Sequence, residues 1–206
     1  MLHTMKTSLL WYVARSSGIV AWGALAFSVI WGLLMTTKLL GRRTRPAWML
    51  DLHRYLGALA MCFTGVHILG IIFDTYAKIG LVTAFVPFAD RQTTIPLTFG
   101  IVSFYMLAAV ELTSLARRRL NKVLWRRIHL LSFPLFLFST LHALTEGTDT
   151  RNLLLLITGG LLFFAVLLLS VFRLEDLVDP EPADVAGGTR APVGLTANSQ
   201  GGPRVS

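Results

Sequence analysis

The sequence predicts an all-α fold, a polytopic membrane helix bundle with about five to six transmembrane helices. Three observations predict it. The 206 residues are 54% hydrophobic and only 15% charged, with a mean hydropathy of +0.63, whereas a soluble globular domain is about one quarter charged. The apolar residues form separate runs of about twenty, the length that an α-helix needs to cross a hydrocarbon core of about 30 Å. The charged residues gather between these runs.

Five apolar runs are long enough to span, and they cover about residues 17–37, 50–73, 96–115, 123–144 and 152–172. The preceding residues 1–16 are predicted to form an N-terminal interfacial segment. A shorter apolar stretch at residues 79–88 contains a proline and is expected to be interfacial or re-entrant, not a sixth span. The transmembrane bundle is therefore expected over residues 17–174. The acidic and then Gly- and Pro-rich residues 175–206 predict a disordered cytoplasmic tail.

The distribution of basic residues predicts the orientation of the chain. They concentrate in the first and third connections: Lys38, Arg42, Arg43, Arg45, Arg117, Arg118, Arg119, Lys122, Arg126 and Arg127. By the positive-inside rule these connections are cytoplasmic, so the N-terminus is outside and the C-terminus is cytoplasmic. The net charge of +8 then reflects topology and indicates no nucleic-acid partner. The expected location is integral to a membrane, the bacterial cytoplasmic membrane.

Four histidines lie inside two of the apolar runs: His53 and His67 in the second, His129 and His142 in the fourth. Gaps of fourteen and thirteen residues place the rings about 21 and about 19.5 Å apart along the helix axes. Because both runs cross in the same direction, His53 and His129 share the cytoplasmic depth, while His67 and His142 share the outer depth. The sequence therefore predicts two His/His pairs near opposite faces of the bilayer.

Paired imidazoles can fill both axial positions of a haem iron, which favours electron transfer over binding of a small molecule. We therefore expect two b-type haems, with axial ligands paired as His53/His129 and His67/His142. Arg54, Arg126 and Arg127 are predicted to pair with propionates at the cytoplasmic edge. Arg151 and Lys78 are weaker candidates at the outer edge. Trp48 and Trp125 are predicted interfacial belt residues.

Helical phase is the difficulty for this arrangement. Fourteen residues return to within about 40° of the starting direction, so His53 and His67 share a face. Thirteen residues miss by about 140°, so His129 and His142 do not share one on an ideal helix. Pro134 lies between them and predicts a kink, which need not recover the whole mismatch. The two haems would otherwise approach this helix from different sides.

Two rival functions stay open. A haem-free transporter could pass zinc or copper along the histidines, although the second and fourth runs add only Asp51 and Cys62 to its ligands. A structural subunit could use the histidines as interhelical hydrogen-bond partners. The single cysteine, Cys62, excludes a disulfide within the chain and a cysteine-ligated iron–sulfur cluster.

The segments LHRYLGALAMCFTGVHIL and WRRIHLLSFPLFLFSTLHAL resemble the ferric reductase-like transmembrane domain superfamily. That superfamily includes the membrane part of NADPH oxidases, eukaryotic ferric reductases and the MsrQ-like haem subunit. The resemblance covers about residues 10–175 and implies two b-type haems with the same fourteen and thirteen spacing. It places His53 with His129 on the inner haem and His67 with His142 on the outer one.

The resemblance implies an oxidoreductase component that passes electrons from a cytoplasmic-side donor to an acceptor on the outer face. Larger members add a domain with FAD and NAD(P)H sites, but only about thirty residues follow the last run and no glycine-rich dinucleotide fingerprint is present. The donor is therefore expected to be a separate flavoprotein or a quinol. Ferric iron, oxygen or a partner reductase are the expected extracytoplasmic acceptors. The family core often has six spans, one more than counted here.

Overall fold

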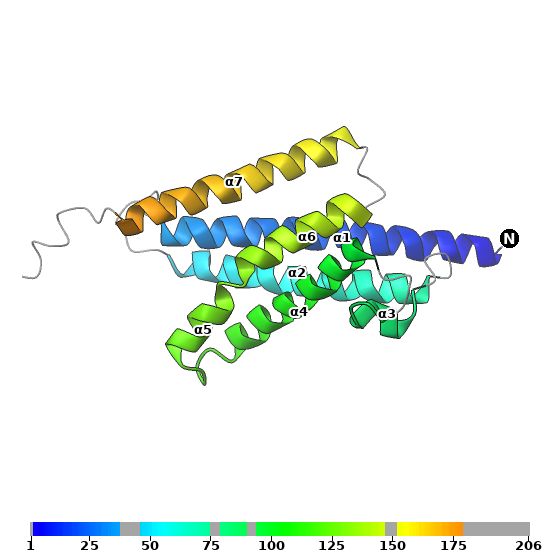
Figure 1. Cartoon of the computed structure of the whole chain (residues 1–206), viewed down its shortest axis with the longest axis horizontal. Helices are drawn as coiled ribbons and strands as arrows, with labels where there is room; N and C mark the ends of the chain where they lie inside the picture. The colour runs from blue at the N-terminus through cyan, green and yellow to red at the C-terminus, as the bar shows by residue number, and fades with distance from the viewer. Residues whose placement is uncertain (1, 38–45, 75–78, 90–93, 147–151, 179–206) are drawn as a thin grey trace, which may run out of the picture.

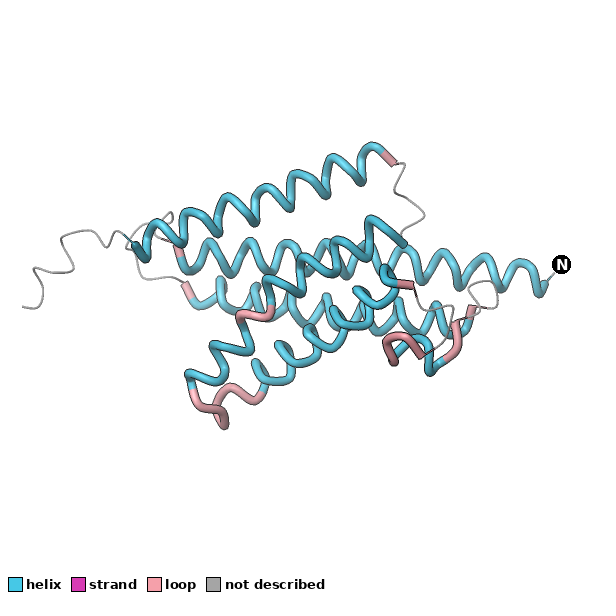
Figure 2. The backbone as a smooth tube through the Cα atoms, in the orientation of Figure 1, coloured by secondary structure: helices cyan, strands magenta, loops and turns pink. Residues whose placement is uncertain are grey.

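The structure is a computed structural model that describes residues 2–37, 46–74, 79–89, 94–146 and 152–178, with side chains omitted at 2–8 and 174–178. Within these ranges every regular element is a helix (Figure 2). In chain order the helices are α1 (Leu2–Thr36), α2 (Ala47–Phe73), α3 (Leu81–Phe85), α4 (Ile95–Leu115), α5 (Lys122–His129), α6 (Ser132–Glu146) and α7 (Leu153–Val178). The predicted all-α fold is confirmed.

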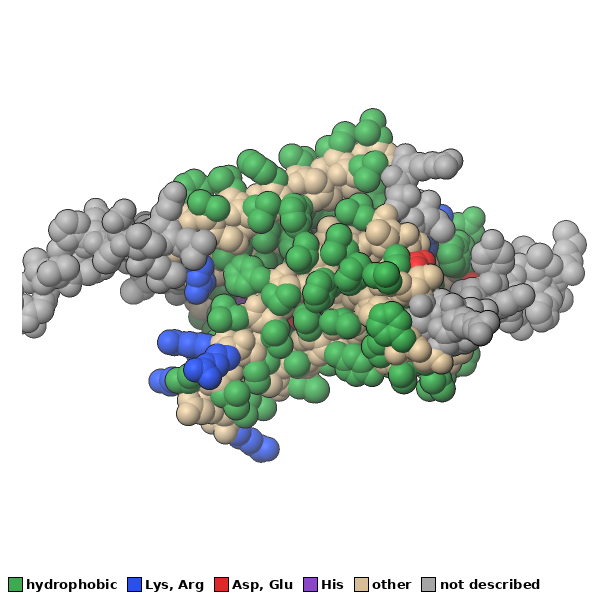
Figure 3. Space-filling view, viewed as in Figure 1, with side chains coloured by type: hydrophobic (Ala, Val, Ile, Leu, Met, Phe, Trp, Pro, Cys, Tyr) green, Lys and Arg blue, Asp and Glu red, His purple; other side chains and the backbone are tan. Residues whose placement is uncertain are grey.

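Five segments are long and apolar enough to cross a membrane: Leu9–Thr36, Ala47–Phe73, Ile95–Leu115, Lys122–Glu146 and Leu153–Arg173. They lie roughly along one direction, with α1 beside α2 through the length of the bundle and α7 on the opposite side of α1 from α2 (Figure 1). Apolar side chains cover the visible surface between the two ends (Figure 3). A protein that exposes this much apolar surface is an integral membrane protein, because lipid and not water satisfies such a surface.

The first helix begins earlier than the sequence indicated. A span from residue 17 was expected after an interfacial segment, but α1 is continuous from Leu2 and its apolar span begins at Leu9. The hydroxyls of Ser16 and Ser17 donate back to the carbonyls of Tyr12 (2.8 Å) and Val13 (2.6 Å). Side chains bonded this way continue a helix and do not cap one.

The fourth span is broken where the proline requires it. The backbone leaves regular helix at Leu130 and Leu131, between α5 and α6. Pro134 has no N–H and its ring clashes with the carbonyl four residues earlier, which is that of Leu130. The predicted kink is confirmed, and it takes the form of a short turn in which Leu131 N–H donates to the carbonyl of Ile128 (2.9 Å). This turn rotates α5 relative to α6.

The stretch at residues 79–88 forms only the five-residue helix α3, so it is no sixth span. Tyr105 donates from its hydroxyl to the Phe85 carbonyl (2.9 Å), and the rings of Phe85 and Phe104 lie 5.7 Å apart. These contacts hold α3 against α4 at the end of the bundle opposite α5 (Figure 1). At the C-terminus α7 continues to Val178, and residues 179–206, where a disordered tail was predicted, lie outside the described residues.

The core lies where α1, α2, α4, α6 and α7 meet, and small residues of α1 allow the close approach. Ala26 and Ala60 are fully buried, and Leu135 and Phe136 of α6 are almost so. Because lipid supplies no hydrophobic drive between helices, such small residues let dispersion contacts and hydrogen bonds associate them. α1 packs along α2, and α4 packs mainly on α6. His53 and His67 of α2 therefore lie between α1 on one side and the α5–α6 span on the other.

Candidate functional site

The structure brings the four histidines together as two pairs. The ring centroids of His53 (α2) and His129 (α5) lie 6.0 Å apart, and those of His67 (α2) and His142 (α6) lie 6.3 Å apart. The planes within each pair are steeply inclined, at 68° and 78°. Since α5 and α6 are separated by the turn before Pro134, both histidines of the fourth span can face α2 despite their mismatched phase. No third metal-ligating side chain joins either pair among the described residues.

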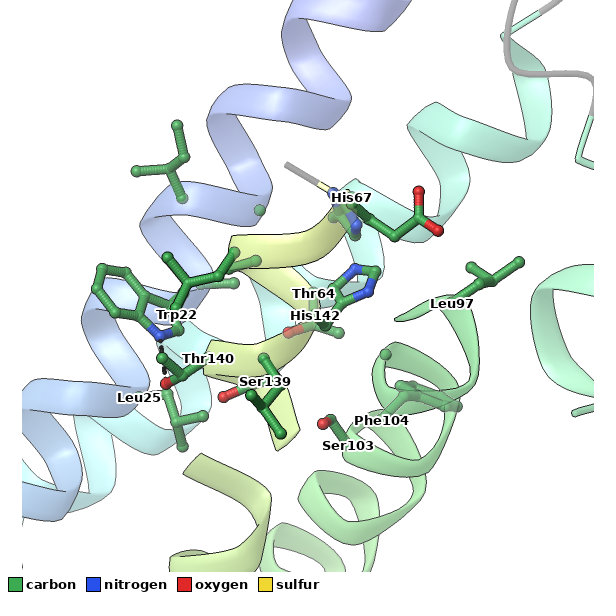
Figure 4. A pocket seen from close by; sticks show the side chains of 18 of the residues that line it. Trp22, Leu25, Thr64, His67, Leu97, Ser103, Phe104, Ser139, Thr140 and His142 are labelled. Carbon is green, nitrogen blue, oxygen red and sulfur yellow. Dashed lines mark hydrogen bonds between the residues drawn. The ribbon is translucent and has the colours of Figure 1, made fainter. Parts of the chain in front are cut away.

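The pair at the α3 end is oriented by backbone carbonyls. His67 Nδ1 lies 2.7 Å from the Ala14 carbonyl of α1, and His142 Nδ1 lies 3.0 Å from the Pro96 carbonyl of α4. A carbonyl only accepts, so Nδ1 must carry the proton in both rings. The Nε2 lone pair of each ring is then available to a metal. Figure 4 shows the two imidazoles close together, His67 on α2 and His142 on α6.

Two glycines make room for these rings. A Cβ at Gly18 of α1 would lie 2.7 Å from His67 Nδ1, and a Cβ at Gly100 of α4 would lie 2.8 Å from His142 Nδ1. Real Cβ atoms essentially never come within 3.0 Å of another heavy atom in this way. Each imidazole therefore presses against the bare backbone of the neighbouring helix, close to the carbonyl that orients it. Glycine is required here for close approach and not for backbone conformation.

A cavity of about 520 Å³ surrounds this pair. Its volume falls within the range of small-molecule and cofactor sites. His67, His142, Gly18 and Gly100 all line it, and so does Arg15 of α1. On its far wall the Trp22 indole N–H donates to the Thr140 hydroxyl (3.0 Å), which ties α1 to α6 (Figure 4). The side chains that line the cavity are apolar apart from a few groups.

The pair at the α5 end has a different setting. His53 Nδ1 lies 3.1 Å from the Ser28 carbonyl and 3.2 Å from its hydroxyl, and Gly32 leaves room for the ring. His129 instead stacks on the Trp125 indole, with centroids 5.0 Å apart at 29°. The Arg117 guanidinium lies over the same indole, 4.6 Å from its centroid. Among the described residues, neither His129 Nδ1 nor Trp125 Nε1 has a hydrogen-bond partner, although both are buried.

The predicted propionate partners lie at this same end. Arg126 and Arg127 are exposed on α5, within the last two turns before the break. Arg54 is also exposed and lies 3.7 Å from the Asp51 carboxylate. Basic side chains gather visibly at this end of the bundle (Figure 3). The outer-edge candidates Lys78 and Arg151 lie outside the described residues.

Several side chains at the two pairs were not assigned a role from the sequence. Arg15 fell in the predicted interfacial segment, yet it lines the cavity beside His67. Trp125 and Arg117 were attributed to the interfacial belt and to topology, but they form a stack on His129. Glu111 was overlooked, although it is the sole charged residue within residues 96–115. That isolation in an apolar run was the signal that would have found it.

Four further glycines differ in what surrounds them. Gly57 faces the Glu111 carboxylate of α4, and Gly159 contacts the Trp22 ring, so these two allow close helix contact. A Cβ at Gly65 or Gly160 would meet nothing within 4 Å.

Residues 9–149 match a protein family described as a domain of unknown function (DUF8596). The match covers more than half of the chain, includes all four paired histidines and ends before α7. No curated protein and no solved structure matches the chain. The chain belongs to the family described as a domain of unknown function (DUF8596).

Proposed function

We propose that this membrane protein is a di-haem b-type cytochrome, similar to the ferric reductase-like transmembrane domain, that carries single electrons between the two faces of the bilayer. The observation that supports it most is the pairing of the histidines, at ring-centroid distances of 6.0 and 6.3 Å. His53 and His129 would hold one haem, and His67 and His142 the other. Bound haem supplies a one-electron iron couple at each end of the bundle.

The ring separations fit a metal held between two imidazoles. With metal–nitrogen bonds of about 2 Å, and a ring centroid roughly 1 Å beyond each nitrogen, two opposed imidazoles have centroids about 6 Å apart. Both observed separations match this value. In three of the four rings the Nδ1 proton is committed to a carbonyl, as is usual for the second nitrogen of a metal-bound histidine.

The number of ligands favours haem over a bare metal ion. A structural zinc site uses four protein ligands and a catalytic one uses three, whereas each site here offers two. Two is the number that remains when a porphyrin supplies four in-plane nitrogens. The transporter alternative has no specific observation in its favour, because in the described part of the chain no cluster of three or more ligating side chains forms.

The end of the bundle that is rich in basic residues supports a direction for the proposed electron transfer. Arg117, Arg126, Arg127 and Lys122 are exposed at the end that holds His53 and His129, and the positive-inside rule makes that end cytoplasmic. A separate flavoprotein or a quinol would then donate there. The acceptor, such as ferric iron, oxygen or a partner reductase, would take electrons at the His67/His142 end. Because an electron is negative, moving it outward through the full field of an inside-negative membrane is favourable by about 2.3 kcal/mol per 100 mV of membrane potential.

The side chains at each pair have distinct tasks in this function. Each histidine pair would hold one haem, and the one-electron iron couple that haem supplies would suit electron transfer. Arg15 at one site and Arg117 at the other place positive charge near the pair, where it can hold propionates.

The experiment that tests this function compares the purified protein with histidine variants, using dithionite-reduced absorption spectra. We expect His53→Ala and His129→Ala each to remove the same haem, and the double variant to remove no more. His67→Ala and His142→Ala should each remove the second haem and leave the first. His3→Ala, which alters the one histidine outside the pairs, should leave both. Spectra that are unchanged by the four paired variants would refute the proposal.

A further inference from the structure

The carboxylate of Glu111 lies inside the membrane-spanning part of α4, one turn before the helix ends at Leu115. It is half-buried and points at α2, where a Cβ at Gly57 would overlap its Oε1 atom. Among the described residues, the carboxylate has no hydrogen bond or ion pair. An ionisable group held in this way within a span is expensive to charge and marks a functional site by default.

Glu111 belongs to the His53/His129 site by its depth. Gly57 follows His53 by four residues, about 6 Å along the α2 axis, and precedes His67 by ten residues, about 15 Å. Along α4, Glu111 is fifteen residues, or about 22 Å, from Pro96, whose carbonyl orients His142. The carboxylate therefore faces α2 one turn inside the His53/His129 pair and far from the other.

Few other charged or titratable groups lie at this end of the elements packed on α4. On α2 these are Asp51, His53 and Arg54, and exposed Arg54 lies near exposed Asp51. On α5 they are Lys122, Arg126, Arg127 and His129, of which the first three are exposed. On α6 the titratable groups are His142 and Glu146, both at the opposite end, and α3 carries none. Glu111 is thus the acidic group closest to the interior at this site.

We infer that Glu111 is the proton-accepting group linked to reduction of the site between His53 and His129. This inference rests on the proposed function. When the site gains one electron from a one-electron reductant, the local charge falls by one, because both imidazoles stay neutral. Glu111 takes up one proton from the aqueous phase at the basic end, and the net charge inside the membrane is unchanged. On oxidation the carboxylate returns that proton.

The physical reason is the low dielectric around the pair. A carboxylate beside an oxidised, net-positive iron centre has a favourable charge to face. Once reduction removes that positive charge, the anion is left unpaired in a medium that solvates it poorly, which favours the neutral acid. Coupling of this kind makes the midpoint potential fall as the pH rises, by at most about 59 mV for each tenfold fall in proton concentration.

The test is a spectroscopic redox titration of the full-length, haem-loaded protein at several pH values, for the parent and for Glu111→Gln. We expect one of the two potentials of the parent to fall with pH. In Glu111→Gln the same potential should lose this slope and lie above the parent value at high pH, because the negative charge is gone. Glu111→Asp should restore the slope. Asp51→Asn makes the same carboxylate-to-amide change at an exposed position of the same end and should keep the slope.

A parent protein with two haems and pH-independent potentials would overturn the inference while leaving the proposed function intact. A slope that survives in Glu111→Gln would also overturn it, because the proton would then reside elsewhere. A protein that binds no haem would instead refute the proposed function. The same titration of His67→Ala, which should retain only the haem at the His53/His129 site, shows which haem is coupled to the proton. A pH-dependent potential in this variant assigns the coupling to the His53/His129 site.

Discussion

Substituting Gly18 with alanine tests most sharply whether close packing of the His67 ring against α1 is needed to hold that ring in place. The added Cβ would lie 2.7 Å from His67 Nδ1 and 3.0 Å from its Cε1. The ring cannot turn away freely, because its Nδ1 proton is committed to the Ala14 carbonyl 2.7 Å away on the same helix. Gly23 offers a matched control on α1, since a Cβ there would meet nothing within 4 Å.

The magnitude follows from three terms. Replacing a helical glycine by alanine favours the helix by up to about 1 kcal/mol in both variants, so this term cancels in the comparison. Overpacking against a fixed ring costs about 1–3 kcal/mol, and losing the carbonyl hydrogen bond costs about 1 kcal/mol more. The net difference of about 2–4 kcal/mol corresponds to roughly 30- to 1,000-fold weaker haem binding at one site.

The assay is the haem-to-chain ratio of each purified variant, measured with subsaturating and with excess haem. We expect Gly23→Ala to match the parent at two haems per chain. Gly18→Ala should retain one haem tightly and fill the second only with excess haem. Equal haem-to-chain ratios in the two variants would show that the His67 ring can move without loss of haem binding. That result would refute the proposal that packing against Gly18 holds this ring in place.

The remaining predictions concern the break in the fourth span, the cation in the cavity and the stack at the basic end. Pro134→Ala supplies the N–H that a regular helix would direct at the Leu130 carbonyl, which now accepts from Phe133 N–H (3.2 Å). Circular dichroism should show slightly more helix, and haem analysis should show one site weakened as the phase mismatch returns, whereas two tight sites would show that the turn is not needed. Arg15→Gln should lower the midpoint potential of the haem that His67→Ala removes and leave the other potential unchanged, because loss of a positive charge favours the oxidised form. Arg15→Lys should largely restore that potential. Identical redox titrations of the parent and Arg15→Gln would exclude Arg15 from that site. Trp125→Leu removes the ring on which His129 stacks and should weaken haem binding at the His53/His129 site by about 0.5–1.5 kcal/mol. Haem titration would detect this change as a loss of affinity of up to about tenfold. An unchanged affinity would show that Trp125 is only an interfacial belt residue.

Much of the fold was predictable because membrane helices leave direct marks in a sequence. The run lengths located all five spans, since every backbone polar group must be satisfied within its own helix. The juxtaposition of His53 with His129 and of His67 with His142 was also predictable, because the rise of a helix is nearly constant. The break in the fourth span followed from Pro134, which cannot donate to the carbonyl four residues earlier.

The details of the two sites were not predictable from spacing. Which carbonyl meets each imidazole depends on how α1 and α4 are shifted along α2 and α6, and a single sequence does not contain that register. The roles of Gly18 and Gly100 follow from the same register. The start of α1 was misplaced because the long apolar run begins only after Arg15, Ser16 and Ser17. In the fold, the hydroxyls of both serines bond backwards to carbonyls of the same helix, so the helix continues through them.

The haem-to-chain ratio of the full-length protein, purified from a haem-supplied host, tests the central claim most directly. Two haems per chain, with the low-spin spectrum of iron that has both axial positions filled, is the result that the two histidine pairs predict. A folded, monodisperse protein that takes up no haem when haem is in excess would contradict it. The pairs at 6.0 and 6.3 Å would then be interhelical contacts without a cofactor.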